Sequence, residues 1–118
     1  MSRERSIVIS QDDFTRLHSL RGHAPLAKEL KRAVVVEPNR VPKDVVAMNS
    51  RVRYEDGSTG EIRDVTIVFP KEADSSKNRL SVLSTVGTAL LGLAVGDSIL
   101  WPFPDGSTRR LRVLRLKG

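Results

Sequence analysis

Two histidines and an adjacent pair of aspartates are the side chains that could perform chemistry. His18 and His23 are five residues apart and have no carboxylate at metal-ligand spacing, so we interpret them as surface residues. Asp12 and Asp13 could form a catalytic pair, but the helix dipole also favours adjacent acids in a first helical turn. The absence of cysteine excludes disulfides, thiolate metal sites and cysteine nucleophiles. We therefore expect no catalytic residue, no metal and no cofactor.

Serine, glycine and aromatic residues give no further sign of catalysis. No serine occurs in a nucleophile-elbow sequence, and residues 87–92 lack the spacing and the lysine of a phosphate-binding loop. The five aromatic residues are scattered, which predicts core positions instead of a stacking platform for single-stranded nucleic acid. Trp101 lies in an expected strand, and we favour a core position for it over a contact surface.

The net charge of +6 is spread along the chain except at its end. Residues 109–118 carry no acid and five basic residues: Arg109, Arg110, Arg112, Arg115 and Lys117. Such a strip could make weak contact with nucleic acid or with an acidic protein surface, although a solvated strand face explains it equally well. The first ten residues contain no apolar stretch of signal-peptide length and no apolar run is long enough to cross a membrane, so we expect neither export nor a membrane span. We expect one cytoplasmic, monomeric protein without membrane contact.

The first part of the chain has the pattern of two short helices. Ser10 is an expected N-cap because Asp13 follows three residues later, and the first helix should end at Gly22. A second helix should begin at Pro25 and bury one face, formed by Leu26, Leu30, Ala33 and Val34. A short connection predicts an antiparallel hairpin with arms of roughly 15 Å. The prolines in residues 37–47 favour an extended connector, so we expect one unit in residues 1–47 and another in residues 48–118.

From Met48 onward the pattern predicts an α+β body. Strands are expected at residues 52–54, 62–69, 80–82, 98–103 and 108–116. A short helix over residues 86–93 should be capped by Ser84 or Thr85 and should end near Gly92. The apolar phase changes near Val113, where we expect a bulge or bend. The expected fold is an antiparallel sheet covered by one short helix.

Residues 84–97, which read STVGTALLGLAVGD, resemble the signature of the C-terminal domain of the bacterial transcript-cleavage factors GreA and GreB. The glycine spacing, Ala89-Leu90 and Gly96-Asp97 carry the resemblance. Residues 44–56, 67–70 and 80–84 resemble the Rnk type within this family, the regulators of nucleoside diphosphate kinase. Together these stretches cover residues 43–118.

This resemblance implies an FKBP-like domain that binds the β′ subunit of RNA polymerase at the rim of the secondary channel. It also implies an N-terminal helical pair directed into that channel. In Gre factors the pair is long, and acids at its tip help to hold a catalytic metal. The corresponding tip here has no carboxylate, since it consists of Arg21, Gly22, His23 and Ala24. With arms this short and no acidic tip, we expect no stimulation of transcript cleavage.

The same resemblance assigns partner binding to Ser84, Thr85, Val86 and Gly87, where unpaired N–H groups would suit an acidic partner surface. This chain has Ser84-Thr85 where the family has Ser-Pro, which removes any contact made by that proline. Packing of the corner alone would explain each of these four residues about equally well.

The expected function is therefore a non-enzymatic, polymerase-binding regulator of transcription. Two alternatives remain at this point. One is a nucleic-acid-binding module that uses the basic residues of 109–117, and the other is an FKBP-like peptidyl-prolyl isomerase, which would need an aromatic-lined pocket.

Overall fold

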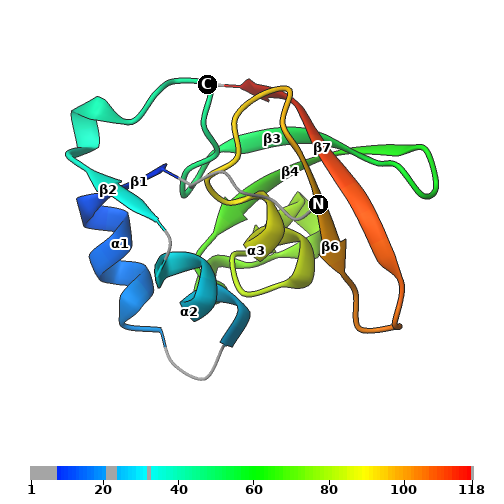
Figure 1. Ribbon diagram of the computed structural model, residues 1–118, viewed down its shortest axis with the longest axis horizontal. Helices are drawn as coiled ribbons and strands as arrows, with labels where there is room; N and C mark the ends of the chain where they lie inside the picture. Colours follow the sequence, from blue (N-terminus) through cyan, green and yellow to red (C-terminus); the bar gives the residue numbers. More distant parts are fainter. Residues whose placement is uncertain (1–7, 21–23, 32, 118) are drawn as a thin grey trace.

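The computed structural model describes residues 8–20, 24–31 and 33–117. A curled sheet of five strands forms the body, in the order β5-β4-β3-β7-β6 (Figure 1). Its strands are β3 (Arg51–Asp56), β4 (Glu61–Val68), β5 (Arg79–Ser81), β6 (Ser98–Pro102) and β7 (Thr108–Lys117). The other strands and α-helices are β1 (Val8–Ser10), α1 (Gln11–His18), α2 (Ala24–Lys31), β2 (Val34–Val36) and α3 (Thr85–Leu90), and a 3₁₀ turn, Pro38–Arg40, follows β2.

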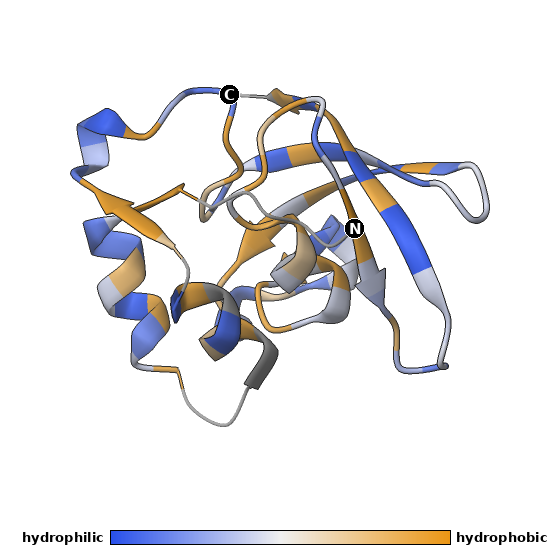
Figure 2. Ribbon diagram, in the orientation of Figure 1, coloured by the Kyte–Doolittle hydropathy of each residue, from blue (hydrophilic) through white to orange (hydrophobic). Residues whose placement is uncertain are grey.

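The sheet buries one face because its side chains alternate. In β3, Val52 and Tyr54 are buried while Arg51 lies exposed on the opposite face. The apolar segments of the strands therefore converge on the centre of the molecule, beside α3 (Figure 2). Trp101 packs partly buried against this core, in agreement with its expected position.

The bulge predicted near Val113 is confirmed. Arg53 pairs with Arg115 and Tyr54 pairs with Val113, so Leu114 is an extra residue on β7. The bulge keeps Val113 buried on the core face while the apolar phase of the strand changes after it.

The expectation of a purely antiparallel sheet is wrong, because β5 pairs with β4 in parallel, with Thr66 opposite Arg79. The connection between these strands contains two 3₁₀ turns, Pro70–Glu72 and Ser75–Lys77, which bring the chain back beside β4. The body is thus a mixed sheet with one short helix. Its FKBP-like character stays a prediction.

The start of α1 agrees with the sequence, since the Ser10 hydroxyl accepts a hydrogen bond from the Asp13 amide at 3.1 Å. Its end does not, because the helix stops at His18 instead of Gly22. The Ser19 hydroxyl donates to the Arg16 carbonyl at 2.7 Å and so occupies an acceptor of the last turn. Of the expected tip, Arg21, Gly22 and His23 lie outside the described residues, and Ala24 is the first residue of α2.

The second helix is also shorter than expected, and placing Val34 on it is wrong. The helix ends at Lys31, and the three valines of β2 pair in parallel with β1. A run of β-branched residues favours a strand once a partner strand is available.

Neither helix projects from the body. Leu17, Leu26 and Leu30 belong to the same core as the sheet, and the Arg16 guanidinium lies 4.2 Å from the centre of the Phe69 ring. Each helix has eight residues, which is about 12 Å, and the molecule measures 36 × 32 × 28 Å. Antiparallel packing of the two helices stays a prediction.

The connector is bound to the body near its end. The Val46 amide donates to the Leu93 carbonyl at 2.8 Å, and the Val95 amide donates to the Asp44 carbonyl at 2.8 Å. A division of the chain between residues 47 and 48 stays a prediction.

Candidate partner-binding corner

The corner between β5 and α3 is held by the hydroxyl of Ser84. This residue is the N-cap of α3, and its Oγ accepts from the Gly87 amide at 3.0 Å. The same hydroxyl donates to the Ser81 carbonyl at 2.7 Å, and the Ser84 amide donates to that carbonyl at 2.9 Å. The predicted cap is confirmed for Ser84, and Thr85 begins the helix instead.

Gly87 lies where no side chain fits. A Cβ at this position would overlap the carbonyl oxygen of Ser81 and lie 2.9 Å from the Ser84 Oγ. Glycine is therefore required by the close approach of α3 to the preceding turn. Gly92, just beyond the helix, has a φ of +84° and ends it as expected.

A second hydroxyl, that of Thr88, ties α3 to the segment that precedes it. Thr88 is 2% exposed, and its Oγ1 donates to the Val82 carbonyl at 2.7 Å. This role was missed in the sequence, because a threonine inside a short helical pattern does not show which distant carbonyl its hydroxyl will meet.

Thr85 and Val86 are partly exposed on this rigid corner, whereas Gly87 is buried. Val86 also packs against the core. Of the two partly exposed side chains, that of Thr85 therefore contributes less to the packing of the corner. The helix has only six residues, too few for a strong dipole, so its positive end adds little to this surface.

The Gly96-Asp97 end of the motif joins the corner to β7. Gly96 has a φ of +92°, and its amide donates to the Val113 carbonyl at 2.8 Å. The Asp97 carboxylate accepts from the Ala94 amide at 2.9 Å. The spacing of the motif therefore has a structural cause at both ends.

The basic residues of β7 do not act as one strip. Arg109 is engaged within the protein, because its guanidinium pairs with Asp56 at 3.1 Å and lies 4.4 Å from the centre of the Phe103 ring. Arg110, Arg112 and Arg115 are exposed.

The partner of Arg109, Asp56, is the one acid buried in the described part of the sheet. Burial acts to raise its pKa, but hydrogen bonds from the Ser58 hydroxyl and amide and from Arg109 outweigh it and lower the pKa below its usual value. This role was also missed, since the strand pattern alone does not show that Asp56 meets Arg109.

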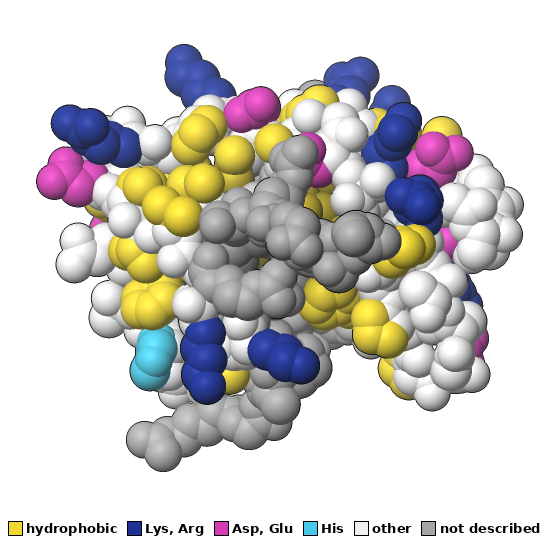
Figure 3. Space-filling view, in the orientation of Figure 1, with side chains coloured by type: hydrophobic (Ala, Val, Ile, Leu, Met, Phe, Trp, Pro, Cys, Tyr) yellow, Lys and Arg dark blue, Asp and Glu magenta, His cyan; other side chains and the backbone are white. Residues whose placement is uncertain are grey.

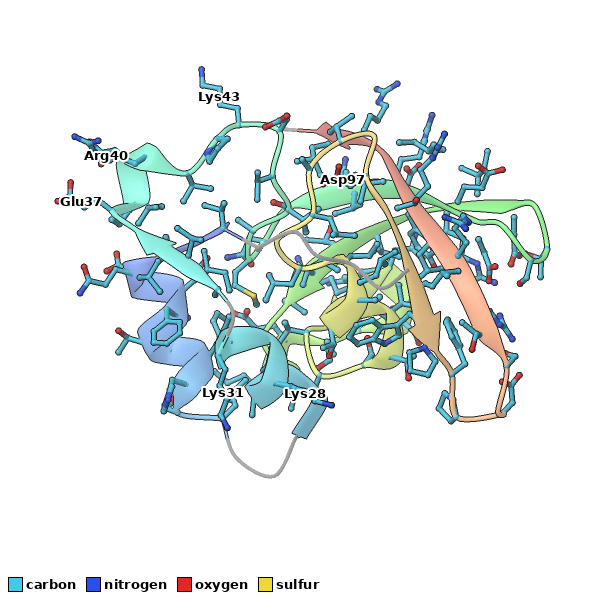
Figure 4. All side chains as sticks on the ribbon, viewed as in Figure 1. Lys28, Lys31, Glu37, Arg40, Lys43 and Asp97 are labelled. Atoms are coloured by element: carbon cyan, nitrogen blue, oxygen red, sulfur yellow. The ribbon has the colours of Figure 1, made fainter. Side chains whose placement is uncertain are left out.

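Other charges are dispersed. Lys28 and Lys31 project from α2, while Arg40 and Lys43 project from the connector at the opposite edge (Figure 4). On the face shown in Figure 3, Lys and Arg side chains are scattered, several along the upper edge and others in the lower central part. Among the described residues no cluster of three acids or histidines is arranged to hold a metal ion, and none of the described helices has the length and apolarity to span a membrane. His18 is exposed and lies beside Phe14, with ring centres 5.6 Å apart.

Comparison with known proteins finds relatives whose similarity covers most of the chain. The protein-family model of the C-terminal domain of the transcription elongation factors GreA/GreB matches residues 41–117, in agreement with the span expected from the sequence. The regulator of nucleoside diphosphate kinase of Escherichia coli K12 is 49% identical over 92 residues, which are 78% of this chain and 68% of that protein. The elongation factor GreA of Clostridium botulinum Eklund 17B is 38% identical over 84 residues, 71% of this chain but only 52% of GreA.

Solved structures of related proteins cover nearly the whole chain. The prokaryotic transcription elongation factor GreA/GreB from Nitrosomonas europaea has a TM-score of 0.75 and 42% identity, over 98% of this chain and 100% of that one. Gfh1 of Thermus aquaticus has a TM-score of 0.54 and 35% identity, over 80% of this chain and 61% of that one. The similarity thus extends from the corner to the helical part.

Proposed function

Because the chain belongs to the GreA/GreB family of transcription elongation factors, we propose that it is a transcription regulator of the Rnk type that binds RNA polymerase. It docks on the β′ subunit at the rim of the secondary channel, in the cytoplasm, and does not stimulate transcript cleavage. It regulates by occupying the rim and excluding other factors that bind there.

The observation that carries this proposal is the construction of the corner. The hydrogen bonds of Ser84 and Thr88 and the close approach at Gly87 fix the backbone, so Thr85 and Val86 are presented in one arrangement. A surface fixed before binding loses little conformational entropy when it meets a partner. This supports docking through Thr85 and Val86, with Ser84 and Gly87 acting as supports.

The helical part supports the absence of cleavage activity. Its helices are about 12 Å long, and Leu17, Leu26 and Leu30 tie them into the core, so they offer no arm that could reach into a channel. His18 at the end of α1 and Lys28 and Lys31 on α2 are exposed, and none of these three side chains provides an oxygen ligand for a divalent cation.

A cleavage assay on stalled elongation complexes tests the proposal. The protein alone should leave cleavage at its intrinsic rate, and in excess it should inhibit cleavage stimulated by GreA because both would occupy the same rim. Stimulation by the protein alone, or full GreA activity at any excess of the protein, would refute the proposal.

A further inference from the structure

A polar hollow of about 210 Å³ lies on the outward face of the sheet and is separate from the corner. It is formed where β3, β4 and β7 adjoin the 3₁₀ turn that precedes β5. Its lining residues are Arg51, Arg53, Asp64, Val65, Thr66, Lys77, Asn78 and Arg115. Only Arg115 among them belongs to the basic strip that the sequence indicates.

The hollow carries an excess of positive charge. Four cations and one carboxylate line it, which leaves a formal charge of +3. Asp64 holds Arg53 in a two-pronged ion pair, with Nε to Oδ1 at 2.9 Å and Nη2 to Oδ2 at 3.1 Å. The side chains of Arg51, Lys77 and Arg115 make no hydrogen bond or ion pair with any described residue, so three cations have donors available.

The register of β3 and β7 brings two of these positive charges together and so makes the sheet less stable. Arg53 lies directly opposite Arg115 across the β3–β7 ladder, and like charges in opposed positions destabilise a sheet. An anion bound between them would convert this repulsion into attraction. The arrangement is therefore more favourable with a ligand than without one.

Uncharged donors complete the lining. Thr66 offers its hydroxyl and Asn78 its side-chain amide. The Thr66 amide donates to the Asn78 carbonyl at 2.9 Å, which ties the turn to β4, and Asn78 has the φ of +57° that ends this turn. The two residues thus sit on connected backbone beside the three arginines.

We propose that this hollow binds a phosphate group, carried either by a free polyphosphate such as a nucleotide or by the backbone of a nucleic-acid strand. Arginine presents planar pairs of donors that match phosphate oxygens, and a formal charge of +3 selects a multivalent anion over a single carboxylate. One water molecule takes up about 30 Å³ in the liquid, so a hollow of about 210 Å³ has room for a phosphate group together with bridging waters. The lining is polar, so recognition acts on the phosphate and not on a base.

The test is an NMR titration of the intact protein with inorganic pyrophosphate at constant ionic strength. Saturable shifts are expected at the amides of Thr66 and Asn78. The double variant Arg51→Gln/Arg115→Gln should bind roughly tenfold more weakly, because two charge-assisted contacts are lost. The matched control, Arg110→Gln/Arg112→Gln, removes two charges from exposed sites on β7 outside the hollow and should bind as the wild type does.

The absence of saturable shifts with pyrophosphate, or equal weakening of pyrophosphate binding in both double variants, would overturn the proposal. Lys77→Gln lies in an exposed 3₁₀ turn outside the sheet, so it provides a second variant that should weaken binding without disturbing the β3–β7 ladder. Polyglutamate that binds as tightly as pyrophosphate would also overturn the assignment to phosphate.

A short single-stranded RNA distinguishes the two sources of phosphate. If the source is a nucleic-acid strand, the RNA should bind more tightly than pyrophosphate. Both double variants should then weaken RNA binding, because the RNA backbone would continue along β7 past Arg112 and Arg110. If the source is a free polyphosphate, pyrophosphate binds more tightly and only the Arg51/Arg115 variant is affected. These measurements use no polymerase, so their failure is independent of the proposed function.

Discussion

Replacing Gly87 with alanine should lower the free energy of unfolding by about 2 kcal/mol, although alanine is the better helix former. On propensity alone the change would stabilise α3 by up to about 1 kcal/mol. However, the new Cβ would overlap the carbonyl oxygen of Ser81, which is backbone and cannot rotate away. The corner would have to open at the three hydrogen bonds that join Ser81, Ser84 and Gly87, each worth about 1 kcal/mol, so the loss exceeds the gain.

Urea unfolding followed by the fluorescence of Trp101, the single tryptophan, measures this difference. Gly106→Ala is a matched control, since Gly106 has a φ of +89° with open space where an added Cβ would lie, and should lose only about 1 kcal/mol from backbone strain. A Gly87→Ala protein as stable as the wild type, or more stable, would refute the account of the corner. Because of this overlap, substitutions at Gly87 cannot serve to test docking.

Three further changes test the packing around the site. Leu17→Ala should cost about 3 kcal/mol in urea unfolding, because Leu17 joins α1 to the core, while the exposed Lys28→Ala should have little effect. Thr88→Val should cost about 1–2 kcal/mol, since it leaves the buried Val82 carbonyl without its donor, and Thr88→Ser should recover most of that loss. The pKa of Asp56 is lowered in the folded state, so its stabilising effect is complete above the ordinary value of 3.8 and is lost as the pH falls through the lowered value. Asp56→Asn should therefore flatten the acid limb of a stability–pH profile; an unchanged limb would contradict the role given to this carboxylate.

Features set by neighbouring residues could be predicted from the sequence. The caps at Ser10 and Ser84 and the bulge at Leu114 follow from side chains a few positions apart or from the phase of a single strand. The parallel pairing of β5 with β4, and of β2 with β1, depends on which distant strand is available, and the strand pattern contains no such information.

In the candidate sites, too, the sequence indicates local features but not contacts between distant parts of the chain. The motif of residues 84–97 located the corner, but only the structure separates the supporting residues Ser84 and Gly87 from the partly exposed Thr85. The basic strip located Arg115, whereas its neighbours Arg51 and Arg53 come from a strand about sixty residues earlier and meet it only through the β3–β7 register.

Binding to core RNA polymerase tests the central claim most directly. Thr85→Glu places a carboxylate at the first turn of α3, where it does not harm the helix but should repel an acidic partner surface. Thr59→Glu makes the same change at the exposed turn between β3 and β4, a part of the molecule that extends away from α3 (Figure 1). In a fluorescence-anisotropy titration, the wild type and Thr59→Glu should bind with equal affinity, and Thr85→Glu should bind roughly tenfold more weakly. Absence of binding by the wild type, or equal binding by all three proteins, would contradict docking through this corner.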